Sequence, residues 1–159
     1  MKDLSNFSAA ERVESLKAGA VAAFGMFWGF GAIALVNTWI LVPRFDFLAG
    51  LQVGAIDLNF AFKGSIALLA GFLFGVTYRY AIRTDTNAQL KSGVVLAFGL
   101  VRACGQLDAG WFFEAGKIPV VQELLPFVVA SVESVVLFAI AGLVLDWAMG
   151  LSYIKRFDS

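Results

Sequence analysis

Residues 18–42 read AGAVAAFGMFWGFGAIALVNTWILV, and this run decides the class of protein to which the chain belongs. It contains no charged residue, it follows Lys17, and it ends before Pro43 and Arg44. A helix needs about 20 mostly apolar residues to cross the hydrocarbon core of a bilayer. The run is also longer than the apolar region of a secretory signal, which has about 7–15 residues. We therefore expect a retained membrane-spanning helix over residues 18–42.

The composition also favours a membrane protein. Of the 159 residues, 60% are hydrophobic and 15% are charged, whereas soluble domains have about 45–50% apolar and about 25% charged residues. We expect a single membrane domain over residues 1–159, with the lipid bilayer as its surroundings. The formal net charge is zero, so nothing favours nucleic acid as a partner. The chain has no histidine, which excludes a histidine-ligated haem or zinc ion and a histidine general base.

Three more apolar runs are long enough to cross a membrane. They cover residues 60–81, 92–113 and 126–148. Together with residues 18–42, these runs predict an all-α, polytopic integral membrane protein, built as a bundle of four transmembrane helices.

Shorter segments complete the expected organisation. Residues 1–17 are expected to form an amphipathic lead, in which Ser8 followed by Glu11 fits a capping box at the start of a short surface helix. Residues 45–59, FDFLAGLQVGAIDLN, are apolar but too short for a separate span. We expect an interfacial or re-entrant segment there, with a plain loop as the alternative. Residues 149–159 are expected to form a polar tail.

Lysine and arginine predict the orientation of the bundle. With four spans, one side carries eight of these residues and the other side carries three. The richer side holds Lys2, Arg12, Lys17, Arg79, Arg83, Lys91, Lys155 and Arg156, and the poorer side holds Arg44, Lys63 and Lys117. Cytoplasmic loops carry the excess of positive charge, so we expect both termini on the cytoplasmic side, or on the stromal side in a plastid.

Small residues at helical spacing predict close contacts between helices. Lipid is as apolar as leucine, so membrane helices associate through close packing and polar contacts. We favour packing within the chain for these small-residue faces, with contacts in an oligomer as the alternative. The faces contain Gly25 and Gly29 in the first span, Gly71 and Gly75 in the second, and Gly99 in the third.

Arg102 raises the question of function. It lies in LAFGLVRACGQLD, residues 96–108, near the middle of an expected span. An arginine at the centre of a bilayer costs roughly 2.5–3.5 kcal/mol on insertion scales, so it needs a partner or a water-filled cavity. Glu133 lies at a similar expected depth on the next span, and Gln106 and Ser134 supply further polar groups. We predict an intramembrane Arg102–Glu133 pair, either as a structural brace or as a functional site.

The expected outer face is mildly acidic, and we interpret its charges as a solvated rim. These residues are Asp46, Asp57, Asp108, Glu114 and Glu123. The sequence contains no nucleophile–base pair, no metal-ligand spacing and no phosphate loop. We therefore expect neither an enzyme nor a metal site.

Aromatic residues keep one further class of protein open. The chain has 16 Phe, four Trp and three Tyr, and such surfaces also suit chlorophyll, carotenoid or quinone. Without histidine there is no strong chlorophyll ligand, so we predict no cofactor. A pigment- or quinone-binding membrane protein is retained as an alternative.

Three stretches resemble small uncharacterised polytopic membrane proteins of cyanobacteria and plastids. They are ALVNTWILVPRFDFLAGLQVG at 34–54, FLFGVTYRYAIR at 72–83 and LKSGVVLAFGLVRACGQLD at 90–108. The resemblance implies the thylakoid or plasma membrane of a photosynthetic cell. It also implies a role in the assembly or stability of a photosynthetic complex, which is an argument by family analogy.

Two functions follow as hypotheses. The first is a non-enzymatic accessory or assembly factor, which contacts a larger membrane complex, or a second copy of itself, through helix faces. The alternative is a small oligomeric transporter or channel that uses Glu133 and Arg102 within the membrane. A dry, fully paired Glu133 would favour the accessory factor, whereas a protonatable Glu133 facing a water-filled cavity would favour transport.

Overall fold

The computed structural model describes residues 9–46, 58–83, 85, 87–112 and 121–157. These residues form only helices and their connections, with no strand among them. The elements are α1 (Ala9–Val36), the π-helix η1 (Asn37–Leu41), α2 (Leu58–Ile82), α3 (Ala88–Phe112) and α4 (Val121–Gly150). Within the described part of the chain, four helices are long and apolar enough to cross a membrane. The expected all-α membrane bundle is therefore confirmed at this level.

The first helix differs from its expected bounds. Residues 9–17, which we expected in a separate amphipathic helix, form the beginning of α1 and continue without a break into the first span. The cap expected at Ser8 lies outside the described residues. Most of the segment 45–59 also lies outside them, so the interfacial or re-entrant segment stays a prediction.

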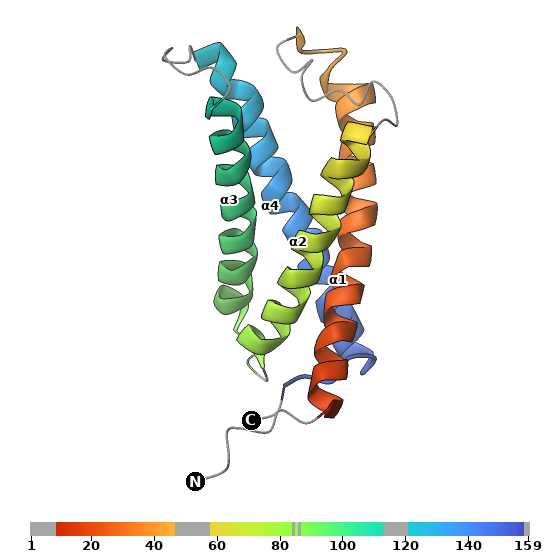
Figure 1. The fold of residues 1–159 in the computed structure, drawn as a ribbon. Helices are drawn as coiled ribbons and strands as arrows, with labels where there is room; N and C mark the ends of the chain where they lie inside the picture. The colour runs from red at the N-terminus through yellow and green to blue at the C-terminus, as the bar shows by residue number, and fades with distance from the viewer. Residues whose placement is uncertain (1–8, 47–57, 84, 86, 113–120, 158–159) are drawn as a thin grey trace.

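The four helices pack as two pairs, which contact each other mainly through α1 and α4. α1 packs on α2, and α3 packs on α4, while α4 also crosses against α1. Figure 1 shows that the two pairs lie close together at the end that holds Ala9 and separate toward the opposite end. We call these the terminal end and the loop end. The Glu11 side chain and the Lys155 backbone carbonyl both contact Arg79 at the terminal end, so both end segments lie on the same side of the bundle.

The predicted glycines lie where helix backbones approach closely. A Cβ at Gly25 would lie 3.4 Å from Ala141 Cα on α4, and one at Gly29 would lie 2.8 Å from Leu137 Cδ1. A Cβ at Gly99 of α3 would lie 2.8 Å from Val135 Cα on α4. Gly71 and Gly75 lie against α1 in the same way, so the small-residue faces make contacts within the chain.

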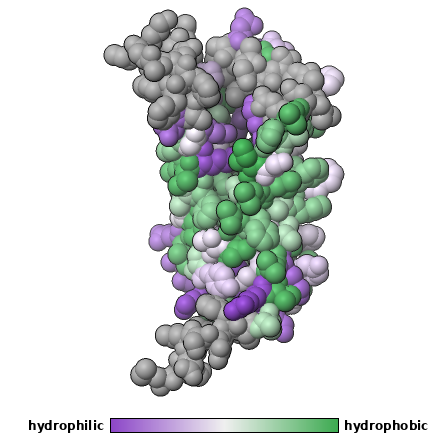
Figure 2. Space-filling model, in the orientation of Figure 1, coloured by the Kyte–Doolittle hydropathy of each residue, from purple (hydrophilic) through white to green (hydrophobic). Residues whose placement is uncertain are grey.

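The apolar side chains divide between a core and an outer belt. The core contains Met26, Phe74, Phe138 and Leu145, all fully buried. Trp28, Leu69 and Leu143 are among the large apolar side chains left exposed. Figure 2 shows this surface as a green belt across the middle of the molecule, with hydrophilic surface nearer its ends. Such a belt fits the hydrocarbon core of a bilayer.

Candidate functional site within the membrane

Five polar side chains from three helices lie in the loop-end half of the bundle. They form the intramembrane polar layer: Asn37 at the start of η1, Arg102 and Gln106 on α3, and Glu133 and Ser134 on α4. Asn37 and Ser134 are only 5% and 3% exposed. Arg102 and Glu133 are half-buried, and Gln106 is exposed. Polar groups at this depth need hydrogen-bond partners because lipid offers none.

Part of this need is satisfied by contacts between the helices. Ser134 Oγ lies 2.8 Å from the carbonyl oxygen of Ala130 and 3.1 Å from Gln106 Oε1, and it donates its one proton to one of them. On the other side of α4, the Asn37 side chain lies close to the Glu133 carboxylate. The layer therefore links α4 to α3 through Ser134 and links α4 to η1 through Glu133.

Three buried atoms of the layer have no hydrogen-bond partner within the described protein. They are Asn37 Oδ1, Arg102 Nε and Glu133 Oε1. A buried polar atom without a partner costs about 1–3 kcal/mol, and more when the group is charged. Such groups persist where a site needs them for something other than stability. This observation makes the layer the strongest candidate for a functional site.

The predicted Arg102–Glu133 pair is not formed. Among the described residues, no nitrogen of Arg102 lies within 4.0 Å of a Glu133 carboxylate oxygen. Successive helical residues point about 100° apart. Val135 of α4 lies against Gly99 of α3, so Glu133, two residues earlier, points about 200° away from that contact. The sequence predicted that Glu133 would meet Arg102 between these two spans, whereas the face of α4 that meets α3 contains Ser134 and Val135 and leaves Glu133 outside it.

Glu133 instead points toward α1. Leu137 and Ile140 of α4 lie against Gly29 of α1. Viewed down the axis of α4, the Glu133 side chain projects in a direction between those of Leu137 and Ile140, so it points to the same neighbouring helix. Its contact with Asn37 agrees with this placement. Arg102 lies one turn from Phe98 and one turn from Gln106, so it shares the face of α3 that contacts α4.

An aromatic cluster lies one turn from the polar layer toward the terminal end. Phe74, Phe98 and Phe138 come from α2, α3 and α4, and their ring centroids are 5.2–5.7 Å apart. Phe98 precedes Arg102 by four residues, and Phe138 follows Ser134 by four, which places both rings about 6 Å from the polar layer. We call this cluster the aromatic layer. It fills the centre of the bundle where α2, α3 and α4 meet.

A second set of polar side chains lies beyond the aromatic layer. Lys91 Nζ forms an ion pair of 2.8 Å with Asp146 Oδ2, and the buried Tyr78 hydroxyl donates to Asp146 Oδ1 at 3.2 Å. These residues come from α3, α4 and α2. Our sequence analysis did not predict this cluster, because Lys91 was interpreted only as one of the positive charges that set the orientation of the bundle.

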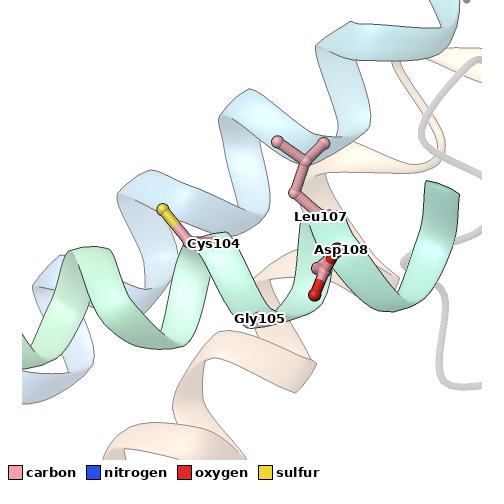
Figure 3. Close-up of a pocket in the computed structure, with 4 residues that line it drawn as sticks. All are labelled: Cys104, Gly105, Leu107 and Asp108. Carbon is pink, nitrogen blue, oxygen red and sulfur yellow. The ribbon is translucent and has the colours of Figure 1, made fainter.

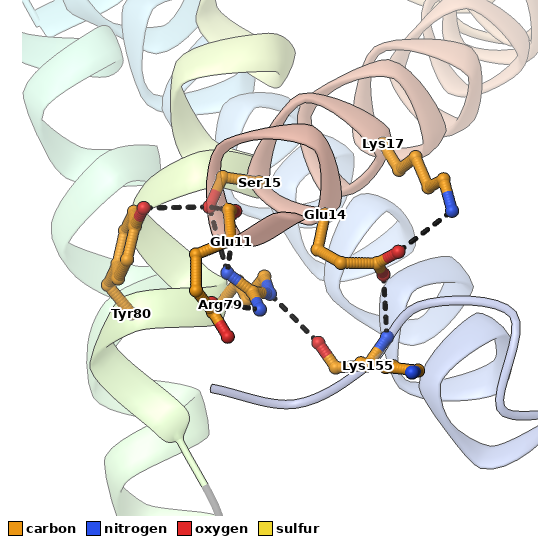
Figure 4. Close-up of polar contacts among 7 residues, drawn as sticks. All are labelled: Glu11, Glu14, Ser15, Lys17, Arg79, Tyr80 and Lys155. Atoms are coloured by element: carbon orange, nitrogen blue, oxygen red, sulfur yellow. Dashed lines mark hydrogen bonds and ion pairs between the residues drawn. The ribbon is translucent and has the colours of Figure 1, made fainter. Parts of the chain in front are cut away.

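Arg79 is the centre of another contact network at the terminal end, shown in Figure 4. Arg79 is only 1% exposed. It donates to the Lys155 carbonyl at 2.8 Å, to Ser15 Oγ at 2.9 Å and to Glu11 Oε2 at 2.7 Å. Sequence reasoning took Arg79 as a residue flanking a span. Its several partners indicate a structural tie between α1, α2 and the tail.

The predicted acidic rim is described only in part. Asp46 and Asp108 are exposed, whereas Asp57, Glu114 and the side chain of Glu123 lie outside the described residues. Asp108 lines an open hollow of about 380 Å³ together with Cys104, Gly105 and Leu107 (Figure 3). Within the described residues, no three Cys, Asp or Glu side chains gather where they could hold a metal ion. The rim residues therefore do not form a recognisable site.

Comparison with known proteins gives no relative. No family model matches the chain, and no curated protein or solved structure is significantly similar to it.

Proposed function

We propose that this chain is a small, non-enzymatic membrane transport protein, in which the intramembrane polar layer lies on the path of the transported species. The observation that carries the proposal is the presence of three buried polar atoms that have no hydrogen-bond partner in the described part of the chain. They lie on three different helices, within the expected spans. Ionisable residues at membrane depth commonly mark ion pathways or proton relays.

The state of Glu133 favours transport over a structural brace. A brace requires that Glu133 and Arg102 neutralise each other, yet Glu133 faces η1 and Arg102 faces α4 from the other side. Glu133 is half-buried, and its Oε1 is buried without a hydrogen-bond partner among the described residues. A carboxylate that Arg102 does not neutralise supports the transporter over the structural brace.

The order of the layers along the bundle also supports a transport path that the aromatic layer closes between two polar regions. The polar layer lies toward the loop end, the aromatic layer follows, and the Tyr78–Lys91–Asp146 cluster lies beyond it. Hydrophobic constrictions close pores by excluding water. In this proposal, the aromatic layer prevents a continuous leak between the two polar regions.

Reconstitution of the full chain into liposomes tests the proposal. Uptake of radioactive sodium and rubidium and the internal pH are followed under an imposed membrane potential. We expect flux above empty liposomes and its loss in Glu133→Gln. Asp46→Asn is the matched control, because Asp46 is an exposed carboxylate outside the helices. Flux that is absent in the folded wild type, or unchanged in Glu133→Gln, would contradict the proposal.

A second candidate function, the accessory or assembly factor, is favoured by one face of α3. Gly93, Ala97, Leu100 and Cys104 recur at spacings of four, three and four residues, and all four are exposed. A Cβ at Gly93 would meet no atom within 4 Å. This spacing and these small side chains suit the close approach of another membrane helix. From the resemblance noted in the sequence, we propose that the partner belongs to a thylakoid complex.

The native Cys104 gives a direct test of this second function. Membranes from the source cells are treated with a short thiol cross-linker, and the products are separated by native and denaturing electrophoresis. Cross-linking of Cys104 to a different membrane subunit, lost in Cys104→Ala, would support the accessory factor. A chain that migrates alone and forms no adduct would contradict it.

A further inference from the structure

We infer that Asn37 and Glu133 form a binding site for a small monovalent cation. This inference names the species bound at the site and rests on the proposed transport function. It is carried by the chemistry of the two atoms that lack partners on η1 and α4.

Both unpartnered atoms at this contact are hydrogen-bond acceptors. A carboxylate only accepts hydrogen bonds, and the Asn37 amide oxygen is also an acceptor. Among the described residues, Asn37 Oδ1 and Glu133 Oε1 have no hydrogen-bond partner, although each atom is buried. Two such oxygens, on side chains that lie close together, suit a cation. Carboxylate and amide oxygens are the ligands that hard cations prefer.

The charge at the contact points to a monovalent ion. Glu133 supplies one negative charge, and Asn37 is neutral. Sites for divalent cations combine several carboxylates, and no group of three acidic, cysteine or histidine side chains is present in the described part of the chain. Arg102 lies on the α3 side of α4, and its free Nε is a donor, so it cannot ligate a cation.

The local backbone supports a site at Asn37. The helix changes from α to π geometry at this residue, and the Val42 amide donates to the Asn37 carbonyl at 3.0 Å, five residues away. Single π turns within helices occur frequently at functional sites. Asn37 is 5% exposed, so its free amide oxygen is held inside the protein and not directed to lipid.

Ion-dependent thermal stability of the full chain in detergent tests the site. Choline chloride is replaced by lithium, sodium, potassium or rubidium chloride at constant ionic strength. A ligand that binds only the folded state stabilises it in a saturable way. We expect a saturable rise in Tm that differs among these cations, and its loss in Glu133→Gln and Asn37→Ser. Ser131→Ala should retain the rise, because Ser131 Oγ contacts only the carbonyl of Phe127 in its own helix.

The outcomes separate this site from the proposed function. Equal Tm values in all salts, or a cation effect that persists in both Asn37→Ser and Glu133→Gln, would overturn the cation site even if liposomes show flux. A selective rise in Tm that both variants remove would establish the site. If the liposomes then show no flux, the transport function would fail while the site would stand.

Discussion

Val135 of α4 lies against Gly99 of α3, and this contact directs Glu133 away from Arg102. A Cβ at Gly99 would lie 2.8 Å from Val135 Cα, which is closer than real side chains approach. The absence of a side chain at one residue thus sets the rotation of α4 about its axis. That rotation places Glu133 against η1 and Ser134 beside Gln106.

Substitution of Gly99 tests this close approach. We expect Gly99→Ala to lower the free energy of unfolding by about 1–3 kcal/mol, as overpacked sites do. Gly105→Ala on the same helix is the control, because a Cβ there would meet nothing within 4 Å. It should be neutral or stabilise the helix by up to about 1 kcal/mol. Circular dichroism during unfolding in mixed micelles measures the free energy of unfolding of each variant. Equal changes in Gly99→Ala and Gly105→Ala would mean that α3 and α4 are not in close contact at Gly99.

The Arg79 network should contribute strongly to the stability of the terminal end. Removal of one partner of a buried ion pair lowers the free energy of unfolding by about 3–5 kcal/mol. We expect a loss near the lower end of this range for Arg79→Met, because the Glu11 side chain is 30% exposed. Arg83→Met is the matched control. Arg83 is exposed and stacks over Phe157 at 5.6 Å, a contact worth about 0.5–1 kcal/mol.

Limited proteolysis provides the readout that is specific to this network. Because Arg79 holds the Lys155 carbonyl, Arg79→Met should make the tail after Gly150 susceptible to proteases at temperatures where the helices are still folded. Arg83→Met should leave the rate of tail cleavage close to that of the wild type. Protection of the tail in both variants would mean that Arg79 does not hold it.

The aromatic layer should control the leak of ions through the bundle. Phe98→Ala removes a ring that contacts both Phe74 and Phe138, so water should enter between the polar regions and cation flux in liposomes should rise several-fold. Phe30→Ala is the control, since Phe30 pairs with Phe60 between α1 and α2. If folded Phe98→Ala shows the same flux as the wild type, the aromatic layer is only packing.

The sequence predicts the helices better than it predicts their faces. Each span is a local property of length and hydropathy, so the apolar runs gave the four membrane helices directly. The direction of Glu133 depends on which face of α4 meets α3. Small residues alone do not identify that face, because Ala141 lies against Gly25 of α1. The contact between Gly99 and Val135 selects the face, and this contact joins residues on two helices.

Two residues of the observed clusters carried signals that our sequence reasoning did not use. Asn37 is the only amide within residues 18–42, and it is buried with a free oxygen. Arg79 follows an apolar run, so it was interpreted as an interfacial residue, although its partners come from α1 and the tail. Both contacts join segments far apart in the sequence, which hydropathy does not reveal.

A double-mutant cycle distinguishes the observed arrangement from the predicted ion pair. If Arg102 and Glu133 are not in contact, the effects of Arg102→Leu and Glu133→Gln on the free energy of unfolding should add within about 0.3–0.5 kcal/mol. Glu133→Gln alone should have a small effect, because glutamine keeps an acceptor oxygen beside Asn37. Unfolding of the wild type, both single variants and the double variant in mixed micelles gives the coupling energy. A coupling of more than about 1 kcal/mol would restore the direct pair and remove the free carboxylate on which the cation site depends.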